Sequence, residues 1–255
     1  MLLRRVEHGD SDLILTFLGR DRGVLSAFAR GARRSKRRFA GCLSWFAISD
    51  VELRRRRGSE LYSLTSANLV RDNTPLAIDP ATLAHASYAT ELCRELLAAE
   101  QPEPAVFELL TGFYATLREH GASRRALRCF ELMLLRELGI APTFARCARC
   151  GTDDEADLAR GAVLDPQGAG VACATCAATI RGTGVRPLGD EARRELLAAS
   201  RVPSLEAAAT LESDADTSDQ VEASRAMTAI ISRHLSKPLR SLEFIAKMSR
   251  PAGTA

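Results

Sequence analysis

The chain has 255 residues, 46% of them hydrophobic, and 35 Lys+Arg face 32 Asp+Glu for a net charge of +3. This length fits one large domain or two ordinary ones, and the hydrophobic content is sufficient for a core. No apolar run approaches the length of a membrane span, and the first residues lack the apolar segment of a signal peptide. We therefore expect a soluble cytoplasmic protein without a membrane partner.

The charge is distributed unevenly. Residues 1–78 hold 15 Lys+Arg against 8 Asp+Glu, a net of +7, whereas the remainder holds 20 against 24, a net of −4. Two dense runs account for most of the excess: Arg30, Arg33, Arg34, Lys36, Arg37 and Arg38, and then Arg54, Arg55, Arg56 and Arg57. One such run alone is more often a solvated loop. Two runs in one structured segment favour a polyanion, and we expect these ten residues to bind nucleic acid.

The segment that carries these runs has a β pattern. Residues 2–6, 13–18, 24–29, 44–53 and 61–65 are short apolar stretches rich in β-branched and aromatic residues, separated by glycine or charge. Five such strands predict a small OB-type β-barrel over residues 1–78, with the basic runs on its connections. Trp45 and Phe46 form an adjacent aromatic pair in the fourth strand. Such a pair can stack on bases, but we interpret both residues as core.

A helical pattern follows from residue 79 to residue 255. Residues 83–99, 104–119 and 123–138 carry apolar residues at three- and four-residue spacing, and further helices are predicted at about 188–200 and 219–235. Ser123 is placed to cap the third of these helices, and Gly139 is placed to end it. An acidic stretch at 212–219 precedes the last one. The expected fold class is α+β, with an OB-type domain at 1–78 and a helical domain at 79–255.

Four of the seven cysteines form two C-x-x-C pairs, Cys147 with Cys150 and Cys173 with Cys176. Each pair presents two thiolates from one tight turn, so the four supply a closed tetrahedral zinc site. Gly151 and residues 168–170 give the turns backbone freedom. An odd cysteine number and the expected reducing compartment disfavour disulfides. The sequence therefore predicts a structural zinc module at about 143–187, inserted in the helical domain.

The sequence carries no recognisable catalytic motif. The chain has no phosphate-binding loop, and its four histidines are scattered without metal-ligand spacing. The remaining cysteines, Cys42, Cys93 and Cys129, lie in apolar contexts and are expected to act as small hydrophobic residues. A metal-dependent nuclease with Asp214 and Asp216 as ligands remains an alternative, but no residue pattern favours an enzyme.

Three sequence strings carry a resemblance to a known family. They are Ala-Arg-Gly-Ala-Arg-Arg-Ser-Lys at 29–36, Leu-Gly-Ile-Ala-Pro-Thr-Phe at 138–144 before Cys147, and His-Leu-Ser-Lys-Pro-Leu-Arg-Ser-Leu at 234–242. Together with the basic barrel and the cysteine pairs, they resemble the zinc-bearing branch of the RecO family of bacterial recombination mediators, in the same order over most of the chain. One departure is Arg37, where a serine is expected after the lysine.

The resemblance implies a non-enzymatic protein of DNA repair and recombination, associated with the nucleoid in the cytoplasm. Such a protein binds single- and double-stranded DNA, anneals complementary strands and assists recombinase loading on DNA coated by single-stranded-DNA-binding protein (SSB). Its implied partners are RecR, RecF in many bacteria, and the acidic C-terminal tail of SSB, which the helical domain would receive.

Arg124, Arg125 and Arg128 are candidate contacts for that tail, since residues 124 and 128 share one helix face. A solvated helix face explains these arginines equally well. The alternative for the whole chain is an RNA-binding or transcription-associated protein with an OB domain and a zinc ribbon, which would prefer RNA through its 2′-hydroxyl.

Overall fold

The computed structural model describes residues 1–35, 38–39, 41–165, 167, 169–180, 185–211 and 217–248. It divides into two compact units: Met1–Gly121 together with the residues from Leu239 onward, and Ala122–Pro238. The first unit contains the strand region together with the first two long helices. Among the described helices, none combines the length and hydropathy that a membrane span requires.

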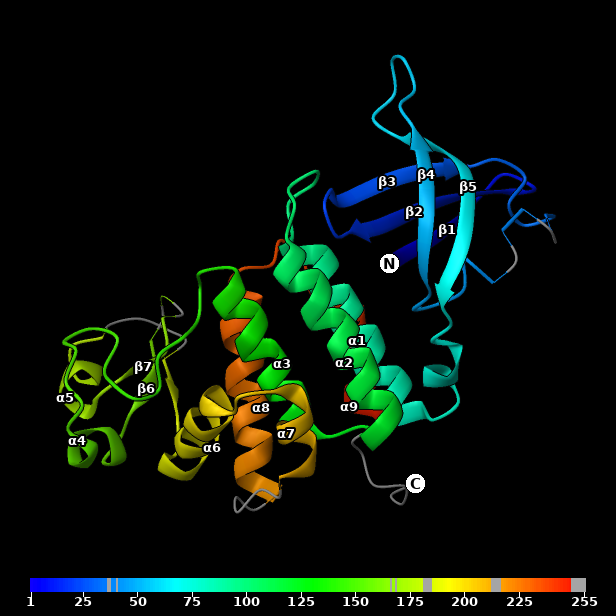
Figure 1. Cartoon of the computed structure of the whole chain (residues 1–255). Coiled ribbons are helices and arrows are strands. Elements are labelled where there is room, and N and C mark those ends of the chain that lie inside the picture. The colour runs from blue at the N-terminus through cyan, green and yellow to red at the C-terminus, as the bar shows by residue number, and fades with distance from the viewer. Residues whose placement is uncertain are drawn as a thin grey trace. The chain divides into compact units, whose positions relative to one another are not determined.

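The first unit is built on a five-stranded sheet, blue to cyan in Figure 1. Its strands are β1 (Leu2–His8), β2 (Asp12–Gly19), β3 (Gly23–Ala29), β4 (Ile48–Arg54) and β5 (Tyr62–Arg71), in the order β1-β2-β3-β5-β4. Only β3 and β5 run parallel; the other neighbours are antiparallel. The OB-type sheet is confirmed, whereas the expected closure of its strands into a barrel stays a prediction. Among the described residues no strand pairing closes it, although the Leu2 N–H donates to the Ala47 carbonyl at 3.1 Å, just before β4.

Alternation along β2 explains how the sheet obtains its core. Leu13, Leu15 and Phe17 are buried on one face, and in the β2–β3 register Leu13 lies opposite Ala29 and Leu15 opposite Ala27. Since side chains alternate across a strand, the same register fixes one face toward the interior. The segment after β3 adds further apolar side chains to this core: Ala32, Phe39, Cys42 and Leu43.

The fourth strand begins later than predicted. Residues 44–47 form a turn, and β4 starts at Ile48. Phe46 is buried, as expected, but Trp45 is 54% exposed, so its assignment to the core was wrong. The cause is a backbone turn at Phe46, whose φ of 64° interrupts the alternation that a strand would have imposed.

Helices α1 (Pro80–Leu96), α2 (Pro104–His120) and α9 (Arg240–Met248) complete the first unit, and α1 packs against both others. A short 3-10 helix, η1 (Thr74–Ala77), precedes them. Asp79 caps α1 by accepting from the Thr82 N–H at 2.7 Å. The α1–α2 connection lies along β3, where the Glu100 N–H donates to the Val24 carbonyl at 3.0 Å. The helices are thereby joined to the sheet. Neither η1 nor α9 was predicted.

The second unit packs α3 (Arg124–Glu137) against α6 (Asp190–Arg201), α7 (Leu205–Thr210) and α8 (Thr217–Ser232). Ser123 caps α3 by accepting from the Ala126 N–H at 3.3 Å, and Gly139 follows its end with a φ of 72°, as predicted. Helix α7 was not predicted. The cysteine module adds α4 (Glu155–Ala159), β6 (Val163–Leu164), β7 (Val171–Ala172), α5 (Ala174–Ala177) and β8 (Arg186–Pro187). Its three strands form a small sheet in the order β7-β6-β8.

Candidate metal centre and nucleic-acid interface

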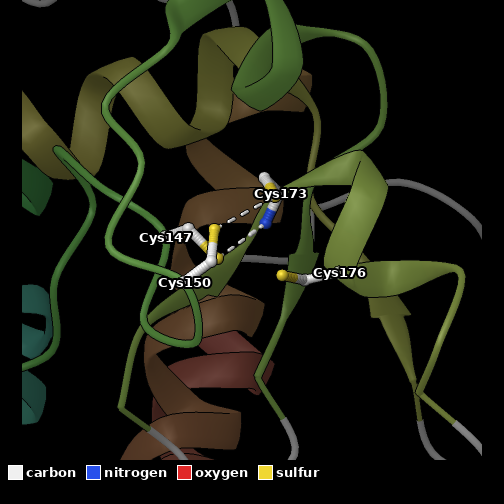
Figure 2. A group of neighbouring side chains, drawn as sticks. All are labelled: Cys147, Cys150, Cys173 and Cys176. Atoms are coloured by element: carbon white, nitrogen blue, oxygen red, sulfur yellow. Dashed lines mark hydrogen bonds between the residues drawn. The ribbon is translucent and has the colours of Figure 1, made fainter.

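The four predicted cysteines meet at one point, as Figure 2 shows. Their sulfur atoms all lie within 4.8 Å of one another, and the sulfurs of Cys150 and Cys173 are 3.9 Å apart. Four thiolates at about 2.3 Å from a tetrahedral zinc ion would be about 3.8 Å from each other. All seven cysteines are free thiols, so disulfides do not compete for these sulfurs. The donor set and its spacing fit a metal ion with four cysteine ligands.

Backbone groups shape the first turn around Cys147. The Gly151 N–H donates to the Cys147 carbonyl at 3.0 Å, and Gly151 has a φ of 77°, which a glycine adopts without steric cost. The backbone N–H groups of Arg149 and Cys173 both donate to the Cys147 sulfur at 3.4 Å. Such donors orient a ligand sulfur and stabilise its charged form.

The two turns are held together through Gly170. Its φ is 127°, and a Cβ at this position would lie 2.0 Å from the Thr143 carbonyl oxygen. Thr143 in turn accepts from the Val171 N–H at 3.0 Å. Only glycine allows this close approach. The expected need for backbone freedom in residues 168–170 is therefore confirmed at Gly170. Gly168 lies outside the described residues.

The sulfurs differ in acidity. Burial by itself raises the pKa of Cys147, but N–H donors from Cys150, Cys173 and Arg149 outweigh it and lower that pKa to about 6. Burial raises the pKa of Cys173, and its hydrogen bond to Asp157 acts in the same direction. The hydrogen bond with Cys150 raises the pKa of Cys176. These N–H donors therefore favour the thiolate form of Cys147, which is the form that binds a metal.

A second layer of polar contacts surrounds the cluster, and the sequence reasoning missed it. Asp157 is 7% exposed and accepts from the Thr175 hydroxyl at 3.2 Å. Arg160 pairs with the same carboxylate at 3.2 Å. No spacing rule ties Asp157 to the cysteines, because the helix α4 that carries it lies between the two turns.

The first basic run lies on the β3–β4 connection, and its described arginines, Arg30, Arg33, Arg34 and Arg38, are exposed. A hydrogen bond and an ion pair connect this segment to β1 and β2. The Gly31 N–H donates to the Asp12 carboxylate at 2.6 Å, and Arg33 pairs with Glu7 at 3.2 Å. The Arg38 guanidinium donates to the Arg30 carbonyl and covers the Phe39 ring. Lys36 and Arg37 lie outside the described residues.

The second basic run lies where β4 ends, in the hairpin loop before β5, and all four arginines are exposed. Arg55 donates to the Tyr62 hydroxyl and to the Glu100 carboxylate, both at 3.2 Å. The Tyr62 hydroxyl also donates to Glu100, at 3.0 Å. Hydrogen bonding to Tyr62, more than the charge of Glu100, raises the pKa of Arg55. Sequence reasoning missed both partners of Arg55, of which Glu100 is remote in the chain.

The three arginines of α3 have unequal surroundings. Arg124 is exposed, but Arg125 pairs with Glu195 at 3.1 Å, and Arg128 is 9% exposed and pairs with Glu131 at 2.7 Å. A solvated helix face is therefore wrong for Arg125 and Arg128. The three side chains border a small hollow of about 30 Å³ together with Glu195, Gln220, Ala223 and Ser224.

No second metal cluster occurs in the described part of the chain, where the four cysteines are the sole group of three or more close ligand side chains. The alternative nuclease ligands, Asp214 and Asp216, lie outside the described residues. Cys42, Cys93 and Cys129 are buried, as expected for small hydrophobic residues.

Comparison with known proteins identifies the family. The model of the family described as Recombination protein O N terminal matches residues 1–73, and that of Recombination protein O C terminal matches residues 78–243. A DNA repair protein RecO from Anaeromyxobacter sp. (strain K) is 39% identical over 246 residues, covering 96% of this chain and 93% of the relative. Another from Myxococcus xanthus (strain DK1622) is 33% identical over 253 residues, covering 97% and 96%. The chain therefore belongs to the RecO family of DNA repair and recombination proteins.

Proposed function

We propose that this protein is a non-enzymatic mediator of DNA repair and recombination that binds single- and double-stranded DNA and anneals complementary strands. The observation that carries this proposal is a sheet of the Recombination protein O N-terminal family with exposed arginines on two connections. Annealing brings two polyanions together, and two clusters of guanidinium groups on one small unit reduce their repulsion. The proposed DNA contacts are the arginines and Lys36 of the runs at 30–38 and 54–57.

The proposed metal is zinc, and its proposed role is structural. Four cysteine ligands leave no coordination position for water or substrate. Binding of the metal would supply part of the free energy that folds residues 143–187.

The proposed partners are RecR, RecF and the acidic tail of SSB, on whose coated DNA the protein would help load recombinase in the nucleoid of the cytoplasm. Arg124 is the exposed candidate for a direct contact with the tail. Arg125 and Arg128 are paired with carboxylates, so they would reach an acidic tail only by exchanging those partners.

The proposal is tested by annealing of complementary oligonucleotides coated with the cognate SSB, either full length or without its acidic tail. Fast annealing that depends on the tail is the expected result. Annealing that ignores the tail would leave a DNA annealer and remove that partner. No annealing of bare or coated strands at low salt would overturn the proposal.

A further inference from the structure

The adjacent aromatic residues of the β3–β4 connection have opposite environments. Phe46 is 2% exposed, and its ring lies edge to face with that of Tyr114 at a centroid distance of 5.5 Å. Trp45, the chain's only tryptophan, is 54% exposed. Tryptophan side chains are usually largely buried in folded proteins. The exposure of Trp45 therefore requires a physical explanation.

The backbone next to Trp45 adopts an energetically unfavourable conformation. Phe46 has a φ of 64°, a left-handed conformation that is unfavourable for a bulky residue and that accumulates at functional sites. Buried Asn73 secures it by donating from its side-chain amide to the Phe46 carbonyl at 3.1 Å. The Ala47 N–H, in the same peptide group, donates to the Ser44 carbonyl at 3.2 Å. The peptide group after Phe46 is therefore held by two hydrogen bonds, in a turn that buries Phe46 and leaves Trp45 on the surface.

The segment that leads into Trp45 borders a cationic hollow. This depression has a volume of about 180 Å³, and its lining includes Arg5, Arg33, Leu43 and Ser44. Arg5 donates to the Leu43 carbonyl at 3.5 Å, so its guanidinium extends toward this segment. Arg33 keeps a partly exposed guanidinium beside one carboxylate, that of Glu7. Ser44, the residue directly before Trp45, lines this hollow, so the tryptophan follows a segment that borders two guanidinium groups.

We propose that Trp45 stacks on an unpaired base of single-stranded DNA while Arg5 and Arg33 contact the neighbouring phosphates. The inference rests on the proposed function and adds to its DNA contacts Trp45 and Arg5, which lie outside the basic runs. An exposed indole offers a flat surface to any base, and guanidinium groups along the hollow that Ser44 lines could contact the phosphates of the same strand. Bases in a duplex are already stacked on each other, so this contact distinguishes single strands from duplexes.

The single tryptophan makes the contact directly observable. Titration of the protein with an oligothymidylate should quench its intrinsic fluorescence in a saturable way, whereas a blunt duplex should leave it nearly unchanged. Trp45→Ala should weaken single-strand binding about 5- to 150-fold, the range expected for one base–aromatic stack, with little effect on duplex binding. Trp45→Phe should retain most of the affinity because it retains a ring.

Ile78→Ala is the matched control, since Ile78 is 83% exposed on the same unit. It should leave both affinities unchanged. Equal single-strand affinity of Trp45→Ala and the parent, without quenching in the parent, would overturn the inference and leave the proposed function intact. Equal losses on single strands and duplex would also overturn it, because they would indicate a damaged fold. A parent protein that binds neither form would overturn the proposed function itself.

Discussion

Gly170 shows how one missing side chain sets the geometry of the cysteine module. Gly170→Ala would place a methyl group 2.0 Å from the Thr143 carbonyl oxygen at a φ of 127°. We expect the module to lose about 1–3 kcal/mol of stability and the protein to retain less zinc. Gly161→Ala is the control, because no atom lies within 4 Å of its Cβ position. Zinc content and thermal unfolding measure the effect; equal values for the two variants would contradict it.

Glu100 opposes the positive charge of the second basic loop. Its carboxylate accepts from Arg55 and from Tyr62, so Glu100→Gln should free the guanidinium for a phosphate. We expect single-strand affinity to rise, at most about fivefold, because exposed ion pairs are weak. The slope of log affinity against log salt should steepen by about 0.7 for one added phosphate contact.

The control for this variant is Glu108→Gln, which removes the same charge from an exposed pair with Arg20. Fluorescence anisotropy over a salt series compares the two. If both variants bind equally well, the effect comes from net charge and the local competition at Arg55 is refuted.

At the scale of elements, helix α6 is joined to the cysteine module by Arg193, whose side chain is fully buried. It donates to the Phe144 carbonyl at 3.0 Å and to Asp190 at 2.9 Å, and it pairs with Glu155 of α4. Arg193→Met should destabilise the protein by about 3 kcal/mol, because it leaves the buried Phe144 carbonyl without this donor and breaks the pairs with Glu155 and Asp190.

The neighbouring Arg194 supplies a matched control, since it pairs with the same Asp190 but is 55% exposed. Arg194→Met should cost at most about 1 kcal/mol. Urea unfolding followed by circular dichroism gives both values. Similar losses for the two variants would show that burial of Arg193 is not what joins α6 to the module.

The cysteine module as a whole should depend on its metal, independently of the sheet. Cys147→Ser leaves three thiolates, so we expect lower zinc content and protease cleavage within residues 143–187, with DNA affinity largely kept. Cys129→Ser is the control, because Cys129 is buried outside the cluster and its sulfur donates to the Ala199 carbonyl at 3.3 Å. Unchanged zinc and protease resistance in Cys147→Ser would contradict a four-cysteine site.

For the whole molecule, the prediction concerns where the basic charge lies. Replacing Arg54, Arg56 and Arg57 by Gln should lower the salt slope of single-strand binding by up to about 2, since each phosphate contact contributes about 0.7. The same number of charges removed from the other unit, at Arg194, Arg201 and Arg225, should leave the slope unchanged. Equal slopes for both triple variants would show that DNA binding does not depend on the sheet's loops.

The sequence by itself determined those features that depend on local spacing. Strand alternation, helical periodicity, the Ser123 cap and the two C-x-x-C turns each involve residues a few positions apart, so a linear pattern is enough to predict them. The same reasoning located the four cysteines of the candidate metal site and the two basic connections. Resemblance of three short strings was enough to indicate the family.

The tertiary structure decided everything that depends on partners remote in the chain. Asn73 fixes the turn that buries Phe46 and exposes Trp45, and Glu195 removes Arg125 from solvent. Glu100 reaches Arg55 only because the α1–α2 connection lies along β3. Burial and ion pairing depend on contacts between segments that are distant in the chain. The periodicity of a single sequence reports only on neighbouring residues, so it does not predict those contacts.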